Sequence, residues 1–191
     1  MKVTRTELAG VLVIEPDVFG DDRGYFLETW SSGRYAEIGV PELFVQDNLS
    51  MSRRDILRGL HLQHPFGQGK LVSVAFGEVF DVALDVRLGS PTFGRWVGTT
   101  LSGDNHRQVY IPPGFAHGFC VTSDTALFSY KCTEPYHRES ELGVAWDDPD
   151  VAISWPVAEP QLSGKDSAFP RLRDIPRERL PSFAAGPGQG A

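Results

Sequence analysis

The sequence lacks the short motifs that mark the common nucleotide-dependent and hydrolytic enzymes. It contains no GxGxxG run, no P-loop ending in Lys-Ser or Lys-Thr, no GxSxG elbow and no CxxC pair. Each of these motifs places a phosphate, a nucleophile or a reactive thiol at one specific turn. Their absence argues against nucleotide hydrolysis, dinucleotide-dependent redox chemistry and serine-hydrolase chemistry.

Cysteine, long apolar runs and positive charge are also scarce. The two cysteines, Cys120 and Cys132, lie in apolar runs, which predicts buried free thiols in a reducing compartment. No apolar run approaches the roughly 20 residues of a membrane span, and the N-terminus lacks the core of a signal peptide. A formal net charge of -7 argues against nucleic acid or an anionic membrane as the main partner. We therefore expect a soluble cytoplasmic protein.

The sequence is rich in short apolar–polar alternations that glycine and proline separate. Such spacing is typical of an all-β sandwich, jelly roll or barrel. Helical periodicity is limited to 32–38 and to a turn or two at 174–180. A turn is predicted at 19–24 and a strand within 57–70. Further strands are predicted at 11–15, 25–30, 44–50, 71–76, 80–86, 95–101, 108–111, 119–121, 126–131 and 143–146.

Two of these strands, 71–76 and 80–86, are predicted to pair as a hairpin around Gly77-Glu78. The 191 residues suit one domain, and no linker divides them. Proline becomes frequent near the C-terminus, and the last ten residues read SFAAGPGQGA. We predict a single domain over 1–181 and a disordered tail over 182–191.

The stretch 57–70, LRGLHLQHPFGQGK, places cations and imidazoles among apolar residues. Burying such groups costs free energy unless they are paired or used, so this stretch is a candidate functional strand. Arg58 and His61 face opposite sides of a regular pleat. Both side chains reach one pocket only if Gly59 introduces a bulge.

The run Pro112–His117, PPGFAH, has the PxGxxH form of the second cupin motif. Metal-binding cupins supply further ligands from an HxH motif with a following Glu. Here the matching place reads His61-Leu62-Gln63, and no Glu follows soon after. Two histidines leave a transition metal short of ligands, so we expect the barrel without a metal. A structural role satisfied by backbone groups and a role in the pocket both stay open for His117.

His61, Lys70 and Tyr130 could together carry out proton transfer. Abstraction of a proton beside a carbonyl needs a base, a group that stabilises the enolate oxygen and an acid that returns the proton. Histidine is the side chain best suited to be the base near neutral pH. The competing interpretations are an edge lysine that guards against aggregation and an ordinary tyrosine on an amphipathic strand.

Eight runs spread over about residues 10–172 carry a family resemblance. They are DDRGYFLE (21–28), QDNLSMS (46–52), LRGLHLQ (57–63), KLVSVAFGEVFDVALDVRLGSPTFGRW (70–96), IPPGFAHGF (111–119), YKCTEPY (130–136), WDDPDVAISWP (146–156) and SGKD (163–166). In these runs the chain resembles the dTDP-4-dehydrorhamnose 3,5-epimerase family of nucleotide-sugar enzymes. The resemblance implies a cupin-type jelly roll that works as a homodimer without a metal or a cofactor.

The resemblance also implies catalytic roles. His61 is implied to be the base, and Asp166 of SGKD to orient and charge-stabilise its imidazole. Tyr130 is implied to be the acid on the opposite face of the sugar at C5, and Lys70 to steady the C4 oxyanion. His117 is implied to lie close by in the pocket.

Substrate-binding roles follow from the same resemblance. Arg58 and Lys165 are implied to bind the anionic diphosphate, and Tyr136 to stack on thymine. The implied polar pocket contacts are Gln46, Asn48 and Glu141. The residues implied to reach into the partner subunit's site are Arg23, Phe26 and Glu28.

The implied reaction inverts C3 and C5 of dTDP-4-keto-6-deoxy-D-glucose through an enolate and gives dTDP-4-keto-L-rhamnose. A C3-only or C5-only epimerase, or a ketone isomerase, uses a similar histidine–aspartate pair and stays open as an alternative. A non-enzymatic sugar-nucleotide-binding cupin and a metal-dependent cupin oxygenase or isomerase stay open as well. For Arg23 and Glu28, the competing interpretation is a solvated surface pair.

Overall fold

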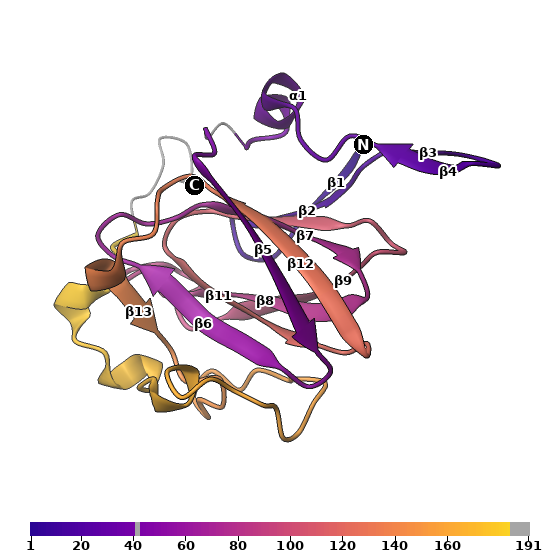
Figure 1. Ribbon diagram of the computed structural model, residues 1–191. Helices are drawn as coiled ribbons and strands as arrows, with labels where there is room; N and C mark the ends of the chain where they lie inside the picture. Colours follow the sequence, from indigo (N-terminus) through magenta and orange to yellow (C-terminus); the bar gives the residue numbers. More distant parts are fainter. Residues whose placement is uncertain (41–42, 184–191) are drawn as a thin grey trace.

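The computed structural model, which describes residues 1–40 and 43–183, consists mainly of two antiparallel sheets that face each other (Figure 1). The six-stranded sheet contains, in spatial order, β1 (Lys2–Arg5), β2 (Leu12–Glu15), β10 (Gln108–Ile111), β7 (Lys70–Phe76), β12 (Thr125–Cys132) and β5 (Gln46–Arg53). The five-stranded sheet contains β13 (Glu141–Gly143), β6 (Leu57–Gln63), β11 (Phe115–Val121), β8 (Glu78–Asp85) and β9 (Trp96–Ser102). The predicted all-β jelly roll is confirmed.

A hairpin and a short helix lie outside these two sheets. β3 (Val18–Asp21) and β4 (Gly24–Leu27) form the hairpin, which projects from the body of the molecule (Figure 1). The helix α1 (Ser32–Glu37), predicted at 32–38, buries Tyr35 against the six-stranded sheet. In the part of the chain that the structure describes, no helix has the length and apolar character needed to cross a membrane.

The main core lies between the two sheets, where the alternation of each strand sends one face inward. Ala126 and Phe128 of β12 meet Phe119 of β11 there, and the rings of Phe119 and Phe128 stack with centroids 4.0 Å apart. Polar side chains at the same alternating positions therefore enter a largely apolar interior. Such side chains need partners or a ligand.

The C-terminal segment covers the outer face of the five-stranded sheet (Figure 1). Val82 and Leu84 of β8 pack there against Leu172, Ile175 and Leu180. This segment also contains three short 3₁₀ turns, η2 (Asp166–Ala168), η3 (Leu172–Asp174) and η4 (Arg177–Arg179). The covering therefore brings a loop with charged residues beside β6.

The predicted hairpin of 71–76 and 80–86 is wrong. β7 pairs with β10 and β12, whereas β8 pairs with β9 and β11 in the other sheet. The chain changes sheet at Gly77, where φ is +77° and a Cβ would lie 2.0 Å from the Thr125 carbonyl oxygen. Local alternation predicts each strand but does not distinguish a chain that folds back from one that crosses over.

Other boundaries differ in part from the predictions, such as the strand expected at 143–146, which lies at 141–143. The turn expected at 19–24 is shorter, because 18–21 and 24–27 pair as strands. Ser182 forms an isolated parallel bridge with Leu88, and the Phe183 N–H donates to the Leu88 carbonyl at 2.9 Å. Of the predicted tail, 184–191 lies outside the described residues. The single domain over 1–181 stays a prediction.

Candidate active site

A hollow of about 350 Å³ lies beside β6. Its lining combines two cations, an imidazole and a carboxylate, which come from β6 and from the loop that leads into η2. The lining residues are Ile56, Leu57, Arg58, His61, Gln161, Leu162, Ser163, Lys165 and Asp166.

Arg58 and His61 reach this hollow together because β6 contains a bulge. His61 pairs with His117 of β11 and Arg58 pairs with Phe119, so three steps along β6 match two steps along β11. At Gly59 φ is +128°, and a Cβ would lie 2.5 Å from the backbone of β11. The condition that the sequence sets for these two side chains, a bulge at Gly59, is therefore met.

His61 and Asp166 form a hydrogen-bonded pair. Nε2 of His61 lies 2.7 Å from Oδ1 of Asp166, and the side chains are 28% and 5% exposed. The backbone N–H of Asp166 donates to Ser163 Oγ at 3.1 Å. Burial alone would raise the pKa of Asp166, but the hydrogen bond and charge of His61, with Ser163 and Lys165, outweigh burial and lower that pKa. An ionised Asp166 therefore holds an imidazole that also lines the hollow.

A second histidine–aspartate pair lies next to the first. His117 Nε2 is 2.7 Å from Asp81 Oδ2, and these side chains are 8% and 1% exposed. Burial lowers the pKa of His117; Asp81 opposes this shift, while Lys70 and His61 add to it. His117 therefore lies in the interior beside His61, and its partner is a carboxylate.

Lys70 is a buried cation at the start of β7, opposite Ile111 of β10 and Cys132 of β12. Burial lowers the pKa of Lys70, and the charges of Cys132, Asp81 and Glu141 oppose that shift. Among the residues that the structure describes, no carboxylate oxygen lies within 4.0 Å of its Nζ. The interpretation of an edge lysine is wrong, because β7 lies inside the sheet between β10 and β12.

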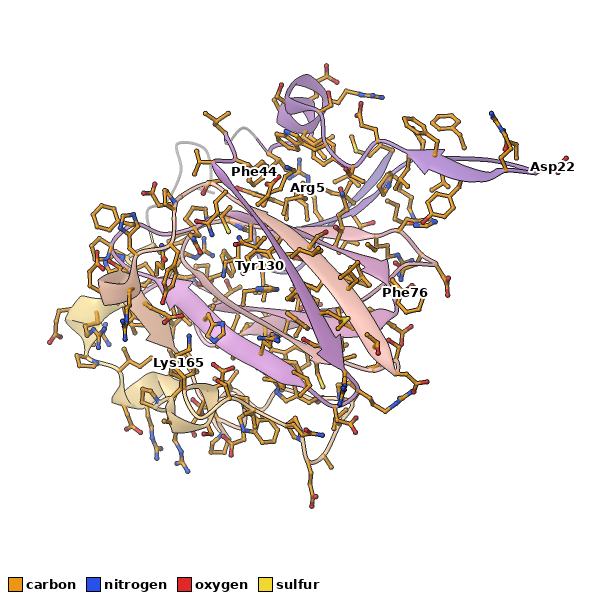
Figure 2. All side chains as sticks on the ribbon, viewed as in Figure 1. Arg5, Asp22, Phe44, Phe76, Tyr130 and Lys165 are labelled. Atoms are coloured by element: carbon orange, nitrogen blue, oxygen red, sulfur yellow. The ribbon has the colours of Figure 1, made fainter. Side chains whose placement is uncertain are left out.

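Tyr130 enters the interior from the sheet opposite His61. It lies on β12 and packs against the main core beside Phe128, with ring centroids 5.9 Å apart. Figure 2 shows Tyr130 on the β12 side of the interior and Lys165 on the β6 side. Burial raises the pKa of Tyr130, with Cys132 adding to the shift and Arg58 opposing it. The phenol therefore keeps its proton near neutral pH, as a general acid must.

Glu141 joins two of the predicted binding residues. Its carboxylate accepts a hydrogen bond from the Tyr136 hydroxyl at 3.1 Å and another from Lys165 Nζ at 2.8 Å. Gln46 Oε1 accepts from the Tyr136 backbone N–H at 3.0 Å, and Gln46 Nε2 donates to Asn48 Oδ1 at 2.9 Å. These five predicted residues form one chain of hydrogen bonds that reaches the hollow at Lys165.

The structure does not bring Arg23, Phe26 and Glu28 to this hollow. All three belong to the projecting hairpin or follow it directly, and Phe26 is 71% exposed. Arg23 and Glu28 form exposed ion pairs with neighbours in the same region. Figure 2 shows Asp22, at the hairpin tip, far from β6. Within one chain these charges are solvated pairs, and their implied reach into a partner subunit's site stays a prediction.

No metal centre is evident in the described ranges. Within residues 1–40 and 43–183, no three side chains of His, Cys, Asp or Glu gather in a way that could hold a metal ion. His61 and His117 each bind a carboxylate instead. That the protein works without a metal stays a prediction.

Comparison with known proteins assigns the chain to a family. The family model described as dTDP-4-dehydrorhamnose 3,5-epimerase matches residues 5–174. The chain belongs to this family. A dTDP-4-dehydrorhamnose 3,5-epimerase from Escherichia coli K12 is 50% identical over 183 residues, which is 94% of this chain and 99% of the relative.

Solved structures of the epimerase family have the same fold. The crystal structure of the 3,5-epimerase from Legionella pneumophila, in complex with dTDP-4-keto-L-rhamnose, has a TM-score of 0.94 and 53% identity, and covers 96% of this chain and 99% of that one. A dTDP-4-dehydrorhamnose 3-epimerase from Streptomyces niveus is also similar, at 43% identity over 87% of this chain and 81% of the relative. The similarity therefore extends to both double and single epimerases.

Three residues that support the epimerase site were missed in the sequence. Ser52 Oγ accepts a hydrogen bond from Arg58 Nε at 3.0 Å, Asp81 holds the second histidine, and Ser163 Oγ accepts from the backbone N–H of Asp166. Two signals were available for the first two. The polar residues of β5 alternate toward the interior, and Asp81 lies with Asp85 on one face of β8, where a buried carboxylate needs a partner. We find no local signal for Ser163.

Proposed function

We propose that the protein inverts C3 and C5 of dTDP-4-keto-6-deoxy-D-glucose and gives dTDP-4-keto-L-rhamnose, in the biosynthesis of dTDP-L-rhamnose or a related deoxysugar. The observation that carries the proposal is the His61–Asp166 pair, at 2.7 Å, beside a hollow that also contains Arg58 and Lys165. The pair supplies a base, and the cations suit a diphosphate. Membership of the epimerase family supplies the substrate class.

The proposed chemistry is proton transfer beside a ketone. The 4-keto group acidifies the C–H bonds at C3 and C5. His61 takes one of these protons, and the electron pair of the C–H bond moves toward the C4 oxygen to form an enolate. At C5, Tyr130 then returns a proton to the opposite face of the carbon, which inverts it. Each inversion leaves a protonated His61, inversion at C5 also leaves an ionised Tyr130, and exchange with water restores both.

Lys70 is proposed to stabilise the enolate oxygen at C4. A fixed cation lowers the barrier when it is placed where negative charge develops, and a water-poor interior strengthens the interaction. Lys70 is suited to this role because its side chain is buried and no described carboxylate lies within 4.0 Å of Nζ.

Arg58 and Lys165 are proposed to bind the diphosphate. Arg58 uses Nε to bond Ser52, and its two terminal nitrogens make no hydrogen bond to any described residue. Lys165 exchanges its present partner, Glu141, for a phosphate oxygen. The Tyr136 ring, which is half exposed, stacks on the thymine base.

The working unit is proposed to be a homodimer with shared sites. Leu49 and Met51 on the outer face of β5 are 66% and 70% exposed, and Phe76 beyond the neighbouring β12 is 66% exposed. Exposed apolar patches of this kind mark interfaces. In such a dimer the projecting hairpin carries Arg23, Phe26 and Glu28 into the partner subunit's site. Sedimentation is expected to give a dimer, and a fully active protein that is strictly monomeric would contradict the shared site.

We also infer that the enzyme works in the cytoplasm. We further infer that it needs no metal or cofactor, because each proposed step uses side chains of the chain itself. Elemental analysis of protein purified without added metal tests the second point. Stoichiometric iron, nickel or zinc that is lost when His61 and His117 are replaced would contradict it.

Proton NMR in D₂O with dTDP-4-keto-6-deoxy-D-glucose tests the function. Deuterium at both C3 and C5, with a 4-keto-L-rhamno product, is the expected result, since both inversions pass through an enolate. Deuterium at only one carbon would move the protein to the single epimerases, which the similarity to the 3-epimerase makes the second candidate. Substrate binding without any exchange would overturn the proposal in favour of a sugar-nucleotide-binding protein.

A further inference from the structure

The imidazole of His61 belongs to a row of inward positions across the five-stranded sheet. In register, the row runs from Gly143 of β13 through His61 and His117 to Ala83 of β8. Residues opposite one another in register project to the same face of a sheet. On its β13 side, His61 therefore has a neighbour without a side chain.

The Phe169 ring fills the space above this neighbour. A Cβ built on Gly143 would lie 2.4 Å from three ring carbons of Phe169. The ring centroid of Phe169 lies 5.6 Å from that of His61, with an interplanar angle of 79°, so that one ring presents its edge to the other. The base of the proposed reaction is thus packed against a ring that reaches it from the C-terminal segment.

The loop between Gln161 and Pro170 supplies Lys165 and Asp166 as well as Phe169. Backbone hydrogen bonds attach both ends of the loop to the sheets. Gln161 makes such bonds near the start of β6, and Pro170 makes one just after β13. Between these ends, the backbone hydrogen bonds of the loop stay within the loop. Side-chain contacts must therefore determine how closely the middle of the loop approaches β6.

We propose that Phe169 is a positioning residue of this enzyme, which by occupying the space above Gly143 docks the loop so that Asp166 reaches Nε2 of His61. The inference rests on the proposed function, because it concerns the base of that reaction. Phe169 contacts the His61 ring and acts only through the His61–Asp166 pair. A displacement of about 1 Å in a catalytic group can lower a rate roughly 10²-fold, so a small shift of the loop is enough.

The first test needs no substrate. Proton NMR observes the imidazole N–H that His61 shares with Asp166, and loss of this signal in Asp166→Asn assigns it. We expect the signal in the wild type, and we expect it to broaden or disappear in Phe169→Ala and in Gly143→Ala, whose new methyl group displaces the ring. The corresponding proton of the buried His117–Asp81 pair should persist in every variant and serves as the internal control.

The second test is a double-mutant cycle in turnover. Phe169→Ala is expected to lower kcat by roughly tenfold when Asp166 is present, and to have little further effect in the Asp166→Asn background. Phe169→Tyr retains the ring and should keep kcat close to the wild-type value. Phe93→Ala, which removes another partly exposed ring from the turn between β8 and β9, is the matched control and should leave kcat unchanged.

A tenfold loss of kcat in both backgrounds would overturn the inference, because a purely structural role does not depend on Asp166. An unchanged His61 signal in Phe169→Ala would overturn it as well. If Phe169→Ala does not fold, Gly143→Ala displaces the ring without deleting it, and the same criteria apply. A wild type that shows the expected signals but exchanges no substrate proton would refute the proposed function alone.

Discussion

The two histidine–aspartate pairs of this enzyme have the same geometry and different surroundings. Each joins a histidine Nε2 to a carboxylate oxygen at 2.7 Å, and His61 and His117 lie opposite each other in register. The side chain of His61 is 28% exposed beside a hollow, whereas that of His117 is 8% exposed in the interior. A short hydrogen bond to a carboxylate therefore does not by itself identify a histidine as a catalytic base. The histidine must also be accessible to a substrate.

The two carboxylates also have different origins. Asp81 lies on β8, which pairs with the strand of His117, so the sheet itself fixes that pair. Asp166 comes from a loop and lies 105 positions from His61 in the sequence. The His117–Asp81 pair therefore depends on strand register, and the His61–Asp166 pair depends on how the loop docks.

The largest expected effect comes from replacing the two histidines separately. His61→Ala should lower kcat/KM by on the order of 10³-fold, because it removes the general base. His117→Gln, which keeps a donor for Asp81, should lower it far less. Steady-state kinetics with circular dichroism as the folding control compares them. Near-normal turnover in a well-folded His61→Ala protein, or equal losses in both variants, would refute the assignment of the base.

Replacing the two carboxylates should give opposite patterns in activity and stability. Asp166→Asn is expected to lower kcat by on the order of 10²-fold, because the imidazole loses its orientation and charge partner. Asp81→Asn leaves a buried imidazole poorly paired and is expected to lower the free energy of unfolding by about 1–3 kcal/mol, with a smaller loss of kcat. Kinetics and urea titration of both variants measure this. A loss of stability confined to Asp166→Asn would contradict the proposal that Asp81 mainly supports stability and Asp166 mainly supports catalysis.

Local patterns in the sequence predicted those features of the fold that depend mainly on residues close together in the chain. The strand at 108–111 and the helix at 32–38 follow from alternation and periodicity, and both are present. The bulge at Gly59 could be stated as a condition, because a regular pleat separates Arg58 from His61. The hairpin around Gly77 was wrong, because alternation carries no information about which sheet a strand joins.

The site needed more than local patterns. Asp166 lies in a turn whose sequence gives no sign of its partner, and only the family resemblance connected SGKD with His61. Asp81 received no role, because its partner depends on the register of β8 and β11, which is a tertiary property. Phe169 received no role, since its position above Gly143 depends on the path of the whole C-terminal segment.

The smallest expected effect that distinguishes the two histidine–aspartate pairs is the pH dependence of the free energy of unfolding. Burial lowers the pKa of His117 below its ordinary value of 6.5, although Asp81 opposes the shift. Below about pH 6.5 the unfolded chain therefore binds a proton at this residue that the folded protein does not bind. The free energy of unfolding should fall as the pH falls through this window, by at most about 1.4 kcal/mol per pH unit from this group.

Urea titrations of the wild type and His117→Gln between pH 5 and 8, at one fixed protein concentration, isolate this contribution. The other histidines are common to both proteins, so the stability advantage of the wild type should shrink as the pH falls. An advantage that grows instead would mean that His117 is protonated in the folded protein and forms a charged pair with Asp81. His117 would then already carry the proton that a base takes up during a reaction. Only access to a substrate would then distinguish the His117–Asp81 pair from the His61–Asp166 pair.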